Sequence, residues 1–349
     1  MQRTHIAILS AAVLSMSIAT GCGNQSSGTQ TVDAARLKMF KPLPEALPIK
    51  PGGAEAERVA LGRMLYYDAR LSKSQTISCN NCHKLDAYGV DNLATSVGFR
   101  QQHGDRNSPT VYNAGAHFVQ FWDGRAADVE AQAKGPVLNP VEMAMASDKQ
   151  VVAVLKSMPE YVGAFRKSFP AGKDPVTFDN AANAIGTFER KLLTPARWDK
   201  FLKGDSAALT PEEKAGFNVF YETGCETCHA GALLGANLYQ KLGNVKQYPD
   251  TTDPGRYNVT KEDGDRMIFK VPSLRNIAKT GPYFHNGKVA KLDDAIAQMA
   301  DYQLGKKLST EEVASIATYL QSLTGEIPTE MIKLPVLPQS TAKTPKPEV

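Results

Sequence analysis

Two copies of one short motif constrain this chain more than any other feature. The motif is Cys-x-x-Cys-His, and it occurs as Cys79-Asn-Asn-Cys82-His83 and as Cys225-Glu-Thr-Cys228-His229. In this arrangement two thiols can add to the two vinyl groups of one porphyrin, and the adjacent histidine can bind the iron. The spacing therefore predicts two covalently bound c-type haems, with His83 and His229 as axial ligands of the iron atoms.

Two other uses of paired cysteines fit less well. One zinc ion could bind all four thiols, but it needs no adjacent histidine, and both copies carry one. A redox-active Cys-x-x-Cys pair calls for a βαβ pattern, which is not seen in the sequence. The fifth cysteine, Cys22, lies far from both motifs, so the odd count needs no disulfide.

The N-terminus has the pattern of an export signal. A positively charged residue precedes an apolar stretch over residues 6–19, which is short for a membrane span. Cys22 follows Ala19-Thr20-Gly21, which is similar to a bacterial lipoprotein cleavage site, with plain secretion as the alternative. We expect a signal peptide over residues 1–21, a lipid on Cys22 and a flexible tether over 22–35. Because haem c matures outside the cytoplasm, the leader agrees with the haem motifs and predicts a periplasmic location.

The two halves of the chain repeat one order of motifs. Downstream of each histidine lie a Pro-containing turn and an aromatic-x-x-Gly segment. Pro109-Thr-Val-Tyr-Asn113 matches Pro272-Ser-Leu-Arg-Asn276, and Phe121-Trp-Asp-Gly124 matches Phe284-His-Asn-Gly287 at the same offset. The duplication predicts two tandem domains whose haems face each other across a pseudo-symmetric junction.

The remaining pattern is helical. Residues Val151 to Val162 keep a helical period after the capping box Ser147-x-x-Gln150, and residues 313–323 do so after Ser309-x-x-Glu312. Thr210-Pro211 begins a third helix, and alternating strand patterns are scarce. We therefore predict an all-α fold of two tandem cytochrome c-like domains, each with one covalently bound haem c. The expected boundaries are residues 36–203 and 204–326, followed by a Pro-rich, extended or loose tail over 327–349.

Charge and hydropathy argue against two classes of partner. The 40 Lys and Arg against 36 Asp and Glu leave a formal charge of +4, which is too small to indicate nucleic-acid binding. No stretch after the leader approaches the roughly 18 apolar residues of a membrane span. Contact with a membrane is therefore expected only through the lipid anchor.

Several longer segments resemble the bacterial di-haem cytochrome c peroxidase family, over about residues 45–325. The segments are Arg106-Asn-Ser-Pro-Thr-Val-Tyr-Asn113, Gln120-Phe-Trp-Asp-Gly-Arg125, Gln132-Ala-Lys-Gly-Pro136, Val141-Glu-Met143, Phe269-Lys-Val-Pro-Ser-Leu-Arg-Asn276 and Tyr283-Phe-His-Asn-Gly287. The resemblance implies reduction of hydrogen peroxide to water with electrons from a small cytochrome c or a blue-copper protein. It also implies a homodimer, for which one sequence indicates no interface.

The resemblance further implies a division of labour between the haems. The haem of His229 would store an electron, with Met299 as second axial ligand, because a His/Met pair raises the potential of a haem. Met267 is the alternative ligand, and core filling is the commoner role of a methionine. The haem of His83 would be the peroxide site, with Glu142 as general acid–base.

The resemblance places Trp122 and a calcium ion between the two halves. Trp122 would relay electrons between the haems, although a tryptophan in the core is also ordinary. Calcium would bind the side chain of Asn107 and the backbone carbonyls of Thr280 and Pro282, which are all oxygen donors. A turn-capping role is the alternative for Asn107.

One position departs from the family pattern. Members that rest in an inactive form carry a distal histidine on the first haem, and the match places Phe99 there, with His103 a little further along. Either His103 is a displaced distal ligand, or Phe99 leaves the iron open and the enzyme needs no reductive activation. The second interpretation is favoured, because a shifted ligand requires a different backbone path. His117 is assigned a structural role only.

Two rival functions are considered beside the peroxidase. A related class of di-haem enzyme oxidises side chains of a partner protein, and its members carry tyrosine at the position of Met299. Met299 and Glu142 favour the peroxidase over this rival. A non-enzymatic electron-transfer cytochrome would instead have two six-coordinate irons and no distal acid.

Overall fold

The computed structural model describes residues 31–348, so Cys22 and the leader lie outside the described residues. Helices and loops dominate, with one antiparallel ribbon of β1 (Tyr239–Lys241) and β2 (Ile268–Lys270), which confirms the predicted helical fold class. None of the described helices is long and apolar enough to cross a bilayer. The helices are α1 (Ala34–Leu37), α2 (Glu55–Tyr67), α3 (Cys79–Cys82), α4 (Val129–Leu138), α5 (Asp148–Lys156), α6 (Pro159–Ser168), α7 (Phe178–Glu189), α8 (Arg197–Leu202), α9 (Pro211–Thr223), α10 (Tyr257–Thr260), α11 (Leu292–Leu304) and α12 (Thr310–Gln321).

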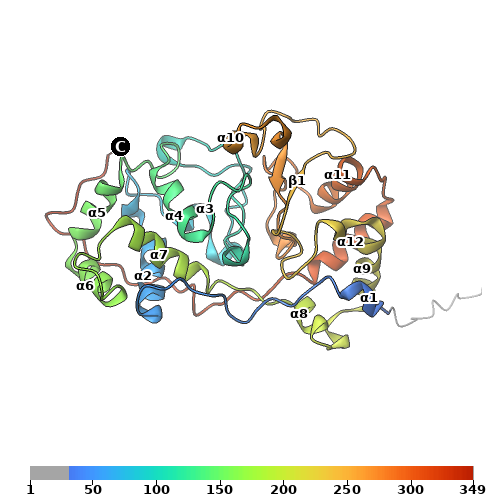
Figure 1. Cartoon of the computed structure of the whole chain (residues 1–349), viewed down its shortest axis with the longest axis horizontal. Helices are drawn as coiled ribbons and strands as arrows, with labels where there is room; N and C mark the ends of the chain where they lie inside the picture. The colour runs from blue at the N-terminus through green and yellow to red at the C-terminus, as the bar shows by residue number, and fades with distance from the viewer. Residues whose placement is uncertain (1–30, 349) are drawn as a thin grey trace, which may run out of the picture.

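Two helical halves lie side by side (Figure 1). In the first half α2 packs against α7, and Leu61, Leu65 and Phe188 are fully buried in its core. The two backbones approach most closely at Gly62, where a Cβ would lie 1.9 Å from the carbonyl oxygen of Ala184. Only glycine permits this helix crossing, because any side chain would collide with backbone.

The second half uses the same device. Helix α9 packs against α12, and a Cβ on Gly216 would lie 2.0 Å from the carbonyl oxygen of Ser315. Around this crossing Trp198, Phe217 and Tyr319 are fully buried, with ring centroids 5.1 to 5.3 Å apart. Such aromatic pairs contribute about 0.5–1.5 kcal/mol each beyond the area they bury.

The sequence repeat is visible where the halves meet. Asn113 and Asn276 are equivalent in the repeat, and both adopt a left-handed backbone, with φ of 61° and 62°. Their side-chain amides donate to the same hydroxyl oxygen, Oγ1 of Thr194, at 2.8 and 2.9 Å. Phe121 and Phe284 likewise share a positive φ, 66° and 65°. The two copies of the turn therefore converge on the segment that connects the halves.

The first and last described segments each pack on the opposite half of the molecule. Phe40 packs edge-on against Trp198 in the second core, with ring centroids 5.6 Å apart. The C-terminal segment is an extended arm on the first half, where Tyr67 Oη donates to the carbonyl oxygen of Ile332 at 2.7 Å. In Figure 1 the blue α1 accordingly lies beside α9, and the red tail runs along the first half. Each of these terminal segments thus contributes side chains to the core of the opposite half.

One expected helix is divided in two. The capping box at Ser147 does begin α5, but this helix ends at Lys156 and α6 begins at Pro159. Proline disfavours a helical backbone in the residue before it, and Met158 is accordingly extended, with φ −115° and ψ 109°. The predicted helices at Thr210 and Ser309 are confirmed, each with its capping box.

A buried ion pair ties the N-terminal segment to the second half. The two terminal guanidinium nitrogens of Arg275 donate to the Asp199 carboxylate at 2.8 and 2.7 Å, and both side chains are buried. The same carboxylate accepts from the backbone N–H of Leu43 at 2.6 Å. The Arg275 side chain thereby neutralises a carboxylate that three parts of the chain share.

We expect Arg275→Met to lower the free energy of unfolding of the holoprotein by about 3–5 kcal/mol, because it leaves a buried charge unpaired. Denaturant titration would measure this change. Lys288→Met is the control, because Lys288 pairs with Asp250 at 2.6 Å but is 65% exposed. The account of this pair is wrong if the two substitutions destabilise the protein equally.

Candidate functional site

Both motif histidines are held in one orientation. The Nδ1 of His83 lies 3.0 Å from the carbonyl oxygen of Pro109, and the Nδ1 of His229 lies 3.0 Å from that of Leu234. Because a carbonyl only accepts, each Nδ1 carries the proton and each Nε2 keeps its lone pair. Burial lowers the pKa of both rings. Both histidines are therefore neutral imidazoles, which is the form that binds a metal.

The four motif thiols are free and partly buried. Burial raises the pKa of Cys82 to about 11 and that of Cys225 to about 12. A redox-active pair needs a lowered thiol pKa, so these shifts oppose that alternative. Across residues 31–348 no three His, Cys, Asp or Glu side chains come together as a metal cluster, which opposes the four-thiol zinc site. Each cysteine pair is left with its own histidine, as haem attachment requires.

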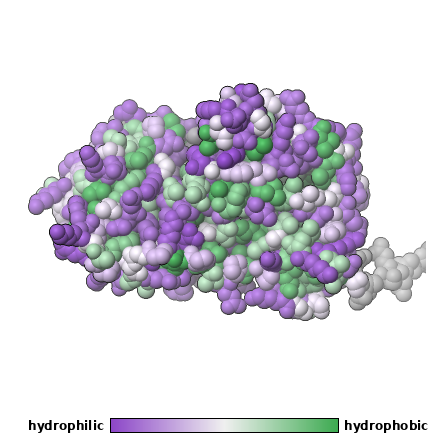
Figure 2. Space-filling view, viewed as in Figure 1, coloured by the Kyte–Doolittle hydropathy of each residue, from purple (hydrophilic) through white to green (hydrophobic). Residues whose placement is uncertain are grey.

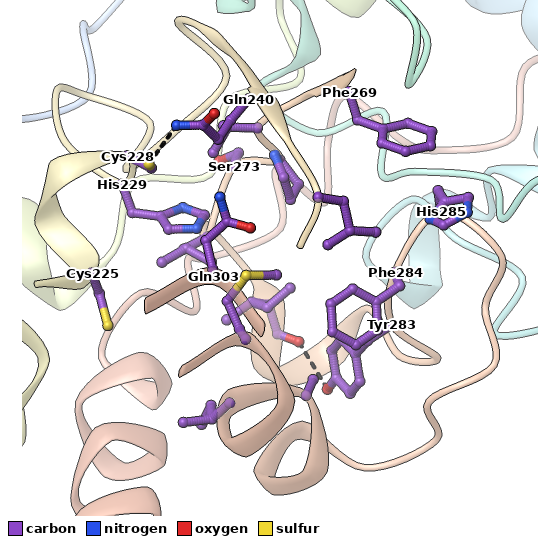
Figure 3. A pocket seen from close by; sticks show the side chains of 18 of the residues that line it. Cys225, Cys228, His229, Gln240, Phe269, Ser273, Tyr283, Phe284, His285 and Gln303 are labelled. Atoms are coloured by element: carbon purple, nitrogen blue, oxygen red, sulfur yellow. Dashed lines mark hydrogen bonds between the residues drawn. The ribbon is translucent and has the colours of Figure 1, made fainter. Parts of the chain in front are cut away.

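The second motif opens on a mostly apolar cavity at the junction of the halves. Cys225, Cys228 and His229 line this cavity, and the ring of His229 is directed into it (Figure 3). Met299, on α11, lines the same cavity, whereas Met267 packs in a separate cluster. Apolar side chains also gather in the hollow between the halves (Figure 2). The cavity therefore brings together two thiols, an imidazole and a thioether on apolar walls, which suits a porphyrin.

Glu142 lies beside the first motif. Burial raises the pKa of its carboxyl, while the charge of Arg125 and a 2.8 Å hydrogen bond from Asn139 Nδ2 oppose the shift. After burial, the charges of Asp91 and Glu142 raise the pKa of Cys82, so the Glu142 carboxylate acts electrostatically on the first motif. A half-buried carboxyl with a raised pKa therefore acts on the first Cys-x-x-Cys pair.

Phe99 is held against Glu142 by the backbone. The Phe99 N–H donates to the carbonyl oxygen of Glu142 at 2.8 Å, and the Phe99 side chain is buried. At Gly98 a Cβ would lie 2.0 Å from the carbonyl oxygen of Val141, so this approach needs glycine. The structure thus places Phe99, and not a histidine, against Glu142, the residue that the resemblance selects as acid–base group.

His103 is placed on the outside of the same loop. It is exposed and pairs with Val97 across the loop. Its Nδ1 lies 3.2 Å from both the carbonyl oxygen and the Oγ1 of Thr95. The ring is therefore engaged by the loop itself.

Trp122 stands at the contact between the halves. Its Nε1 donates to the carbonyl oxygen of Asn107 at 2.9 Å, and its ring lies edge-on to His285 with centroids 6.5 Å apart. His285 is the residue equivalent to Trp122 in the repeat, and it stacks on Phe269 at 4.4 Å. The two equivalent positions therefore meet each other across the junction.

The three residues matched to a calcium site also meet here. Asn107, Thr280 and Pro282 all line the cavity at the junction. The Nδ2 of Asn107 donates to the carbonyl oxygen of Leu93 at 3.0 Å, which leaves Oδ1 as the side-chain atom able to bind a cation. The donor set is compatible with calcium.

Two charged residues of the site were not singled out from the sequence. Arg125 opposes the raised pKa of Glu142, and Lys270 is buried at the junction. Both belong to the segments that carry the family resemblance, Gln120–Arg125 and Phe269–Asn276. The match to the family therefore covers both residues. Their positions in the sequence do not, however, show that Arg125 acts on Glu142 or that Lys270 lines the cavity.

The fold and the paired sites define a two-lobed helical protein with two thiol–imidazole sites. A family model described as di-haem cytochrome c peroxidase matches residues 56–207. The cytochrome c551 peroxidase of Pseudomonas aeruginosa is 46% identical over 316 residues, covering 88% of this chain and 90% of the relative. The cytochrome c551 peroxidase of Nitrosomonas europaea is 43% identical over 324 residues, covering 92% of this chain and 95% of the relative.

A solved structure agrees with these sequence matches. A MauG-like protein associated with microbial copper homeostasis superposes with a TM-score of 0.73 at 26% identity, covering 84% of this chain and 98% of that one. The chain therefore belongs to the di-haem cytochrome c peroxidase family.

Proposed function

We propose that this protein reduces hydrogen peroxide to water with electrons from a small cytochrome c or a blue-copper protein. Besides membership of the family, one observation carries the proposal: burial raises the pKa of the Glu142 carboxyl, and this carboxyl acts electrostatically on Cys82 of the first motif. One site thus has an acid–base group for peroxide, and the other has a second candidate axial ligand, Met299.

The proposed cofactors are two haem c groups. Cys79 and Cys82 would bind one and Cys225 and Cys228 the other, each through thioether bonds, with His83 and His229 as axial ligands. When bound, the haems supply an iron atom that accepts peroxide and the redox centres that deliver two electrons. The Nδ1 hydrogen bonds of the two histidines, which leave each Nε2 free for a metal, support this assignment.

Glu142 is proposed to move the proton. A carboxylate on the peroxide side can accept the proton of the inner peroxide oxygen and return it to the leaving oxygen. The hydrogen bond from Asn139 holds Oε1 and leaves Oε2 as the oxygen that would exchange the proton. Burial raises the pKa of Glu142, so the carboxyl can both take up and release a proton closer to neutral pH.

Met299 and Trp122 are proposed to serve electron transfer. A thioether opposite His229 would raise the potential of the second haem and hold an electron there. Trp122 contacts groups of both halves, which supports a relay role. Calcium at Asn107, Thr280 and Pro282 would fix the geometry between the halves.

The first haem is proposed to be open without reductive activation. Phe99 cannot bind iron, and His103 is engaged by Thr95 at the surface. We expect the oxidised holoprotein to show a high-spin first haem that is unchanged in His103→Ala. In Phe99→His we expect a low-spin first haem and loss of peroxide turnover until the protein is reduced. Electron paramagnetic resonance would measure both, and a low-spin wild-type signal that disappears in His103→Ala would refute the proposal.

The pH dependence of turnover should report on Arg125. Glu142 acts first as a base, so the rate falls as pH drops through its pKa, which burial raises. The charge of Arg125 opposes that shift. We therefore expect Arg125→Gln to move the acid limb of kcat/KM to higher pH, and Arg125→Lys to leave it in place. A limb that moves to lower pH, or equally in both variants, would contradict this role of the charge.

The cellular setting is also a proposal. The leader pattern supports export to the periplasm and a lipid on Cys22, and the resemblance supports a homodimer. The mass of the mature N-terminal peptide would test the lipid.

Stopped-flow mixing tests the function. We expect the half-reduced holoprotein to consume peroxide rapidly when a reduced small cytochrome c is present as donor. Inertness toward peroxide would instead indicate a pure electron-transfer cytochrome. Oxidation of a partner's side chains in place of the donor would indicate the other rival enzyme.

A further inference from the structure

Lys270 is a buried cation at the junction of the halves. Its side chain is only 5% exposed, and its Nζ donates to His117 Nδ1 and to the carbonyl oxygen of Val119, both at 3.1 Å. Among residues 31–348 no carboxylate lies within ion-pair distance of this ammonium. The nearest acidic group that affects it, Asp123, is already bound by Arg106 and Arg125. A buried lysine without a counter-ion is rare in folded proteins, so the site lacks an anion.

His117 has a hydrogen-bond donor without a partner in the same place. An ammonium can only donate, so His117 Nδ1 accepts from Lys270 and the ring proton must sit on Nε2. That Nε2 is buried and has no hydrogen-bond partner. Burial, together with the Lys270 charge, lowers the pKa of His117 well below its usual range, so the ring is neutral and keeps a single N–H. An orphaned buried donor of this kind costs about 1–3 kcal/mol unless something accepts from it.

Both residues line the cavity that also contains Cys225, Cys228 and His229. An ammonium without a carboxylate partner and one unpartnered imidazole N–H therefore lie at the wall of a mostly apolar space. The Phe269-Lys270 peptide is fixed by β-ribbon pairing and by the bond from Lys270 N–H to the carbonyl oxygen of Trp122 at 2.8 Å. The position of the cation is thus set by the fold, as a binding site requires.

We propose that Lys270 and His117 form a carboxylate-binding site that holds a propionate of a haem in this cavity. A haem c brings two carboxylates into an otherwise apolar space, and each must be paired when it is buried. Nζ of Lys270 would neutralise the propionate and Nε2 of His117 would donate to its second oxygen. This inference rests on the proposed function only in that haem fills the cavity. We expect the propionate to belong to the haem attached to Cys225 and Cys228; a propionate of the first haem is the alternative.

Redox titration of the holoprotein, followed separately in the bands of the two haems, tests the site. In Lys270→Met a propionate at this site would lose its cationic partner, and its uncompensated negative charge would favour the ferric state. We expect the reduction equilibrium of the second haem to shift about tenfold toward ferric, or about 59 mV for a one-electron couple. A new redox-linked ionisation should also appear, because an unpaired buried carboxylate has a raised pKa. Lys270→Arg should restore both properties, and His117→Phe should reproduce the shift in part.

Lys241→Met is the matched control, because Lys241 lines the same cavity but is exposed. A shift in the first haem instead of the second would still support a carboxylate site and would assign the propionate to the other haem. The proposal is overturned if Lys270→Met retains full haem content and matches Lys241→Met in potential and pH profile. Peroxide turnover by the wild-type protein is independent of this result, so the failure of one proposal is distinguishable from that of the other.

Discussion

Replacing Glu142 with glutamine is expected to lower kcat/KM for peroxide by about 10²–10⁴-fold, the usual contribution of a positioned acid–base group. Glutamine keeps the size of the side chain and the hydrogen bond from Asn139, but it cannot exchange a proton at neutral pH. Peroxide-dependent oxidation of a reduced cytochrome c measures the effect, and both haems should retain their spectra and potentials. The loss is thus expected in the peroxide step alone.

Glu189→Gln is the matched control for this substitution. Glu189 is also buried in the first half, close to Cys79, and burial raises its pKa to about 8. At pH 7 it is mostly protonated already, so glutamine changes neither its charge nor its shape, and turnover should stay near that of the wild type. Equal losses in the two variants, or full activity in Glu142→Gln, would remove Glu142 from the mechanism.

Replacing Met299 with leucine is expected to have the second large effect. Leucine fills similar space but has no sulfur atom to bind iron, so the second haem would lose its proposed soft ligand. Axial ligands set haem potentials over roughly 0.8 V, and we expect the potential of the second haem to fall on the order of hundreds of millivolts. With a lower potential the second haem would no longer hold an electron, so we expect peroxide turnover to be lost as well.

Met267→Leu is the control, because Met267 packs with Tyr248 and Phe269 in a separate cluster. Spectroelectrochemical titration of the holoproteins should show a change in Met299→Leu only. If Met267→Leu lowers the potential and Met299→Leu does not, the ligand assignment is reversed. If neither variant changes it, the proposed division of labour between the haems is wrong.

Local patterns in the sequence predict many of the helices and turns. The capping boxes at Thr210 and Ser309 predict helices that the structure contains, because capping is decided by residues three apart. The duplicated Asn113 and Asn276 turns are visible in sequence because each is a short, dense motif. The sequence does not predict that the helix is divided at Pro159. The helical spacing of apolar residues continues on both sides of this proline, so the spacing alone does not show the break.

Contacts between distant segments could not be read in this way. Phe40 and Ile332 are apolar residues in short, aperiodic segments, so nothing local indicates that each packs on the opposite half. The same limit applies to the junction, where Lys270 meets His117 across more than a hundred residues. The family resemblance singles out Glu142, Trp122 and Met299. Glu142 and Trp122 lie inside segments that match the family, and Met299 lies at a fixed number of residues after such a segment.

The number of donor molecules oxidised per peroxide decides whether this protein is a peroxidase. Holoprotein would be mixed with a known amount of hydrogen peroxide and an excess of reduced small cytochrome c, and both would be counted until peroxide is exhausted. We expect two donor molecules to be oxidised for every molecule of peroxide lost, with water as the product. Peroxide loss without donor oxidation, accompanied by release of oxygen, or no loss of peroxide at all, would contradict it.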